Sequence, residues 1–133
     1  MVELNELIST SDYISIHAPL TKETRNMFTI EEFKKMKSGS YLINTARGGI
    51  VNEKDLYVAC KKNMIAGAAL DVLSEEPIQP NHFLLELPNV LITPHMAWYT
   101  EEAIHALKES VAEEAVRVLN GEKPINVVND KAL

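Results

Sequence analysis

The stretch YLINTARGGIVNEKDLYVACKKNMIAGAAL, residues 41–70, carries the pattern that most clearly indicates the fold class. It opens with an apolar strand candidate, Tyr41–Asn44, and the pair Gly48-Gly49 then breaks the pattern. A helix candidate runs from Glu53 to about Lys62, and the apolar run Met64–Leu70 follows it directly. A strand, a short helix and a second strand in this order predict a right-handed crossover between two parallel strands.

The same alternation continues on both sides of this stretch. We expect two more strands, at Asp12–His17 and Val90–Ile92. We also expect three more helices, around Leu4 to Ile8, from Thr29 to Met36 and at Glu101–Leu119, and a short extended segment at Pro124–Val128. Strands that alternate with helices in this way predict an α/β fold with about four parallel strands.

Composition narrows the class of protein. The 133 residues, of which 46% are hydrophobic and 24% are charged, suffice for one compact domain with a core. A formal net charge of −6 is the wrong sign for attracting nucleic acid, and no apolar run is long enough to cross a membrane, so we expect neither as a partner. Cys60 is the single cysteine, so no intrachain disulfide can form and we expect a reducing, cytoplasmic location.

Polar or backbone-exposing segments follow directly on each predicted strand. They are Ala18-Pro19, Thr45-Ala46-Arg47, Asp71 and Pro94-His95. Ligands of parallel sheets bind beyond the carboxyl ends of the strands, so we expect these segments to converge on one crevice.

Two of these residues carry recognisable chemistry. Arg47 offers a permanently charged fork suited to a carboxylate, although a surface arginine that stabilises its loop is the alternative. His95 is the candidate proton donor near neutral pH, with Glu76 as its carboxylate partner. The alternatives are a turn histidine bonded to a backbone carbonyl, and a solvated acidic pair made by Glu75 and Glu76.

The remaining candidates have a weaker signal. Asp71 follows a buried strand, so its carboxylate should accept a hydrogen bond in the crevice or cap a turn. We expect structural roles for His17, His82 and His105. No His or Cys cluster has the spacing of zinc ligands, so no metal site is expected.

Four motifs in order resemble the nucleotide-binding domain of the D-isomer-specific 2-hydroxyacid dehydrogenases, close to the glycerate, hydroxypyruvate and phosphoglycerate dehydrogenase-like members. The motifs are His17-Ala18-Pro19-Leu20-Thr21, Leu42–Gly49, Ala66–Val72 with Glu76-Pro77, and Pro88–Val90 with Thr93-Pro94-His95. The resemblance implies a partial Rossmann-like three-layer sandwich, with residues 1–119 as a partial dinucleotide-binding domain and 120–133 as a C-terminal tail that returns to the substrate domain.

The resemblance also implies an activity and a set of site residues. The reaction would be hydride transfer between NAD, with NADP as the other possibility, and a D-2-hydroxy acid or 2-oxo acid. Arg47, Glu76 and His95 would be catalytic. Cofactor-binding positions would be Ala18, Pro19, Thr45, Ala46, Arg47, Asp71 and His95, with Asp71 accepting from the nicotinamide carboxamide.

The chain departs from the family at the phosphate end of the cofactor. Its five glycines contain no G-x-G-x-x-G spacing, so the glycine-rich first βαβ half is lacking. We therefore expect a truncated protein that is a weak catalyst or none by itself, and a homodimer that buries the exposed edge strand, the long-helix face or both. The alternative function is a non-catalytic dimerisation or nucleotide-sensing module derived from the same family.

Overall fold

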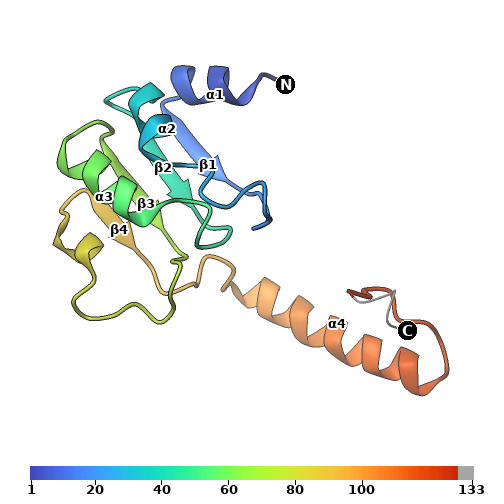
Figure 1. The fold of residues 1–133 in the computed structure, drawn as a ribbon. Helices are drawn as coiled ribbons and strands as arrows, with labels where there is room; N and C mark the ends of the chain where they lie inside the picture. Colours follow the sequence, from blue (N-terminus) through green and yellow to red (C-terminus); the bar gives the residue numbers. More distant parts are fainter. Residues whose placement is uncertain (129–133) are drawn as a thin grey trace. The chain divides into compact units, whose positions relative to one another are not determined.

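Four parallel strands form one sheet in a computed structural model that describes residues 1–128. In sheet order they are β1 (Tyr13–Ile16), β2 (Tyr41–Asn44), β3 (Gly67–Leu70) and β4 (Val90–Ile92). The sheet order equals the chain order, so every connection is a crossover to the next strand along (Figure 1). The predicted α/β fold with four parallel strands is confirmed.

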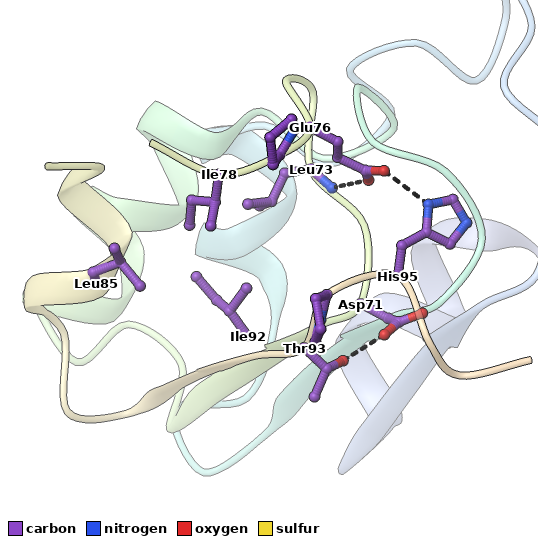
Figure 2. A pocket seen from close by; sticks show the side chains of 10 residues that line it. Asp71, Leu73, Glu76, Ile78, Leu85, Ile92, Thr93 and His95 are labelled. Carbon is purple, nitrogen blue, oxygen red and sulfur yellow. Dashed lines mark hydrogen bonds and ion pairs between the residues drawn. The ribbon is translucent and has the colours of Figure 1, made fainter. Parts of the chain in front are cut away.

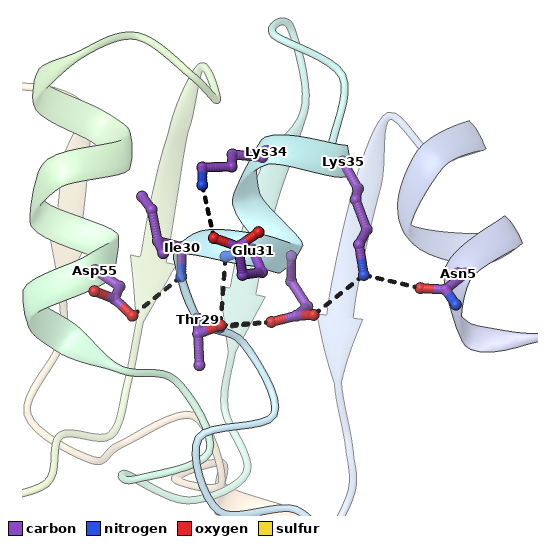
Figure 3. Close-up of polar contacts among 8 residues, drawn as sticks. Asn5, Thr29, Ile30, Glu31, Lys34, Lys35 and Asp55 are labelled. Atoms are coloured by element: carbon purple, nitrogen blue, oxygen red, sulfur yellow. Dashed lines mark hydrogen bonds and ion pairs between the residues drawn. The ribbon is translucent and has the colours of Figure 1, made fainter.

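Three helices accompany the sheet: α1 (Leu4–Thr10), α2 (Ile30–Lys35) and α3 (Glu53–Lys61). Thr29 begins α2 with a capping box, in which its hydroxyl and the Glu32 carboxylate satisfy free backbone N–H groups. Neighbouring helices are tied together by polar side chains, as Figure 3 shows. The Asp55 carboxylate of α3 accepts from the Ile30 amide at 3.0 Å, and Lys35 of α2 donates to Asn5 of α1 at 3.1 Å.

The core lies between the helices and one face of the sheet. Alternate strand residues such as Ile14, Leu42 and Leu70 are buried there, together with Phe33 of α2 and Leu56 of α3. Within the unit Met1–Ala97, the opposite face carries exposed apolar side chains: Tyr13 and Tyr41 stack at 5.6 Å between ring centroids, and Leu91 is exposed beside them on β4.

Three segments differ from the sequence-based expectation. The strand predicted from Met64 begins only at Gly67, because the Met64 N–H bonds to the Ala59 carbonyl at 2.8 Å and thereby completes the end of α3. An unexpected 3₁₀-helix, η1 (Phe83–Glu86), follows, with His82 at its start. The segment Pro124–Val128 contains no strand among the described residues.

The chain divides into two compact units, Met1–Ala97 and Trp98–Leu133. The second contains α4 (Glu101–Leu119), which Thr100 caps by accepting from the Ala103 amide at 3.1 Å. The domain boundary expected after residue 119 stays a prediction, and residues 129–133 of the predicted tail lie outside the described residues. None of the helices found within residues 1–128 is long and apolar enough to span a bilayer.

Candidate functional site

The carboxyl ends of the four strands form a level edge. Ile16 pairs with Asn44, Asn44 with Leu70, and Leu70 with Ile92 across the sheet. The predicted site segments, Ala18-Pro19, Thr45-Ala46-Arg47, Asp71 and Pro94-His95, each begin one or two residues beyond this row. The strands therefore bring all four segments to one edge of the sheet.

His95 and Glu76 form a direct pair. The His95 Nδ1 lies 2.7 Å from the Glu76 Oε2, and the other Glu76 oxygen accepts from the Leu73 N–H at 2.9 Å. Burial alone would raise the pKa of Glu76, but the bonds from His95 and Leu73 hold it below its ordinary value. An ionised carboxylate can only accept, so Nδ1 carries the hydrogen of this bond.

The backbone of His95 is held in an unusual conformation that aims the ring at Glu76. Its φ of 52° lies in the left-handed region, which costs a non-glycine residue about 1–2 kcal/mol. The His95 N–H donates to the carbonyls of Asp71 at 2.9 Å and Thr93 at 3.0 Å, so the strained turn is fixed to the end of β3. Strain retained at such a position is typical of a functional site.

Asp71 is the polar centre of this turn, and only 4% of its surface is exposed. Its Oδ1 accepts from the Thr93 hydroxyl at 2.5 Å and the Met96 N–H at 2.9 Å, and its Oδ2 accepts from the Ala97 N–H at 2.8 Å. Burial would raise the pKa of Asp71, but these hydrogen bonds outweigh it and hold the pKa below the ordinary value of an aspartate. The capping role weighed from the sequence is therefore observed, and Oδ2 retains capacity for one further donor.

Arg47 lies in the loop that follows β2. Its exposed guanidinium donates to the adjacent Ala46 carbonyl at 2.7 Å, and Asn44 holds the Arg47 carbonyl at 3.0 Å. The next residue, Gly48, lies so close to Leu73 that a Cβ there would overlap the Leu73 carbonyl oxygen. The loop that carries Arg47 thus packs against the loop that carries Glu76.

A cavity of about 490 Å³ lies next to the His95–Glu76 pair, and Figure 2 shows the residues that line it. Its walls are mostly apolar, with polar groups at one end; the lining residues are Asp71, Leu73, Glu76, Pro77, Ile78, Leu85, Ile92, Thr93, Pro94 and His95. In Figure 2 the second ring nitrogen of His95 points away from Ile78 and Leu85. The cavity and this second nitrogen therefore lie on different sides of the imidazole.

Residues 1–97 match the family model described as D-isomer specific 2-hydroxyacid dehydrogenase, NAD binding domain. The chain belongs to this family. A glyoxylate reductase from Thermofilum pendens is 47% identical over 131 residues, which cover 98% of this chain and 39% of that protein. A D-3-phosphoglycerate dehydrogenase from Methanocaldococcus jannaschii is 46% identical over 127 residues, covering 96% of this chain and 24% of that protein.

The fold agrees with solved members of the D-2-hydroxyacid dehydrogenase family. D-Lactate dehydrogenase from Lactobacillus jensenii, solved with NAD⁺, superposes with a TM-score of 0.87 at 31% identity, covering 96% of this chain and 42% of that one. The present chain therefore spans between 24% and 42% of the length of these three relatives. The resemblance drawn from the four motifs is confirmed.

The residues at the strand ends suit one end of a dinucleotide. Thr45 and Pro19 are exposed, and Ala18 and Ala46 are half-buried and have small side chains. Asp71 has an acceptor position to spare. These features fit a nicotinamide ring with its carboxamide, whereas the sequence contains no glycine loop for a pyrophosphate.

Sequence reasoning gave no role to two residues that hold the site together. Thr93 donates to Asp71, and Asn44, which is 1% exposed, bonds to both the Ala46 amide and the Arg47 carbonyl. Both are polar residues at the end of apolar strands. That position was a usable signal, because a buried polar side chain requires partners.

Proposed function

We propose that this edge of the sheet is the part of a 2-hydroxyacid dehydrogenase site at which a 2-oxo acid is reduced and a 2-hydroxy acid is oxidised. The observation that carries the proposal is the His95–Glu76 bond of 2.7 Å, which holds an imidazole at the ligand-binding edge of a parallel sheet. A nicotinamide cofactor would supply and accept the hydride.

His95 performs the proton transfer in this proposal. Glu76 holds Nδ1–H, so Nε2 faces the substrate oxygen, donates a proton to it during reduction and takes one back during oxidation. The Glu76 carboxylate also fixes the orientation of the ring through the bond to Nδ1, so the same nitrogen exchanges the proton in both directions. Catalysis here is the placement of one proton and one charge beside the reacting carbonyl.

Arg47 would bind the carboxylate of the acid. Its guanidinium is exposed, and its bond to the Ala46 carbonyl leaves other N–H groups of the fork available. A carboxylate accepts two parallel bonds from such a fork, which orients the C2 carbonyl as well as binding it. This requires the side chain to turn from Ala46 toward the acid.

Segments 18–19 and 45–46 would line the nicotinamide end of NAD or NADP, and Asp71 would accept from the carboxamide through Oδ2. Without a phosphate-binding loop in these 133 residues, the chain by itself should bind the cofactor weakly and turn over slowly. Cytoplasmic location and homodimer formation stay predictions.

The competing function is a non-catalytic dimerisation or nucleotide-sensing module. One observation favours it: Asp71 accepts three hydrogen bonds that hold a turn, and an inactive relative would also need these bonds for its structure. The strained, carboxylate-paired His95 favours the enzyme, because a sensing module gains nothing from an imidazole held at this cost.

Binding can be mapped on the isolated chain. We expect NADH, added to the ¹⁵N-labelled protein, to shift backbone amide signals at Ala18, Thr45, Ala46, Asp71 and His95. Added glyoxylate should then shift Arg47, and Arg47→Ala should abolish this second effect while the first remains. Shifts located elsewhere on the sheet, or none at the solubility limit of NADH, would contradict the proposal.

A further inference from the structure

We propose that Glu53 is a positioning residue of the site, because its side chain spans from α3 to the loop that carries Glu76 and holds that loop in place. Glu53 is the first residue of α3, and its side chain is only 14% exposed. Its Oε1 accepts from the Ser74 N–H at 2.6 Å, and its Oε2 lies 3.3 Å from His82 Nε2. One carboxylate thereby joins two points of the connection between β3 and β4.

That connection has little structure of its own. Between the end of β3 and the start of η1 there is neither helix nor strand, yet Glu76 must be placed within hydrogen-bond distance of His95. Ser74 directly follows Leu73, whose N–H holds the Glu76 carboxylate at 2.9 Å. The Glu53–Ser74 bond therefore acts one residue away from the bond that orients Glu76.

The same two loop residues also touch the loop that carries Arg47. Gly48 packs against the Leu73 carbonyl and the Ser74 nitrogen, where no Cβ could be accommodated. Leu73 and Ser74 are thus held between Gly48 on one side and Glu53 on the other. A shift of these residues would alter the placement of Glu76 relative to Arg47.

His82 completes the attachment at the far end of the loop. Its Nδ1 accepts from the Leu84 N–H at 3.3 Å, so Nε2 carries the hydrogen directed at Glu53. Its ring stacks on Phe83 at 4.3 Å, and Phe83 meets Tyr57 of α3 edge to face at 5.6 Å. This histidine, to which the sequence assigned only a structural role in a loop, fixes η1 to the helix that bears Glu53.

An acidic residue in the first turn of a helix is also favoured by the helix dipole, so the two roles must be separated. Glu53→Asp keeps the charge at the helix start but is one methylene too short to reach Ser74. Glu53→Gln keeps the length and an acceptor oxygen but loses the charge. If Glu53 positions the loop, the length of its side chain matters; if it only interacts with the helix dipole, its negative charge matters. Both variants retain a residue that the start of a helix tolerates.

The test is amide hydrogen exchange and ¹⁵N imidazole NMR on the complete 133-residue chain. In Glu53→Asp we expect exchange at Ser74 and Leu73 to accelerate about tenfold or more and the His95 ring nitrogens to shift. In Glu53→Gln the acceleration should stay below about threefold. The amides of α3 should be unchanged in both, and Glu31→Asp, at an exposed position in the first turn of α2, is the matched control.

Wild-type exchange in Glu53→Asp, equal acceleration in the two Glu53 variants, or the same response in Glu31→Asp would overturn the proposal. Its relevance to catalysis rests on the function proposed for His95. The measurement itself contains neither cofactor nor acid, so a failure here and a failure of the dehydrogenase proposal are separate results.

Discussion

Replacing Asp71 should destabilise the protein in a pH-dependent way. Asp71→Ala removes the acceptor of three hydrogen bonds, from the Thr93 hydroxyl and the Met96 and Ala97 amides. Each hydrogen bond to a charged acceptor contributes about 1.5–3 kcal/mol to the free energy of unfolding. Met96 and Ala97 are exposed, so water can replace part of the bonding that their amides lose, and we expect a net loss of about 3–4 kcal/mol. Asp71→Asn keeps one acceptor oxygen and should lose about 2 kcal/mol.

The pH dependence follows from the direction of the pKa shift. The pKa of Asp71 is lowered in the folded protein, so its stabilising contribution is fully present above the unfolded-state pKa and is lost as pH falls through the folded value. The stability difference between wild type and Asp71→Ala should therefore be constant near neutral pH and shrink at pH values below about 3.8.

Urea unfolding followed by circular dichroism, at pH 7 and at a series of acidic pH values, measures both effects. Asp12→Ala is the control, because this carboxylate is 74% exposed in its ion pair with Lys37 and should contribute about 1 kcal/mol or less. A loss below about 1 kcal/mol for Asp71→Ala at pH 7, or a loss that persists unchanged in acid, would show that the Asp71 carboxylate does not stabilise this turn as described.

Three further predictions concern the contact between two loops, the buried thiol and the edge strand. Gly48→Ala should cost about 1–3 kcal/mol, seen as a lower thermal midpoint, because its Cβ has no space beside the Leu73 carbonyl; an unchanged midpoint would be inconsistent with the close contact of the two loops. Cys60 should resist alkylation at pH 8 until the protein is unfolded, because the thiol is buried and burial raises its pKa to about 11; labelling at the rate of a free thiol would oppose this. β1 is an edge strand of the sheet, so static light scattering should give about twice the 14.9 kDa chain mass, and a monomer at all concentrations would exclude the homodimer.

The sequence was most informative where local chemistry decides the structure. The strand Tyr41–Asn44 and the helix that Asn52 caps were predicted nearly to the residue, because apolar periodicity and a capping side chain act within a few positions. The start of β3 was placed three residues too early. The residues from Met64 to Ala66 look equally apolar in a strand or at a helix end, and only the bond from Met64 to Ala59 decides between them.

The site could be predicted in part for the same reason. The positions of Asp71 and His95 at this edge were predicted because each comes within three residues after a strand, and a parallel sheet brings such positions to one edge. The roles of Glu53 and His82 were not predicted, because they depend on long-range contacts. Glu53 bonds to Ser74, 21 positions further along the chain, and pairs with His82, which is further still. No periodicity or capping pattern encodes a contact of that range.

The proton transfer proposed for His95 can be measured in a chimera. This chain would replace the segment it matches in the Thermofilum pendens glyoxylate reductase, to which it is 47% identical over 131 residues, so that the relative supplies the remainder of the protein. We expect the chimera to oxidise NADH with glyoxylate. The His95→Asn version should be slower by about 10²–10⁴-fold while binding NADH equally well. A folded chimera that binds NADH and keeps its rate without the imidazole would contradict the account.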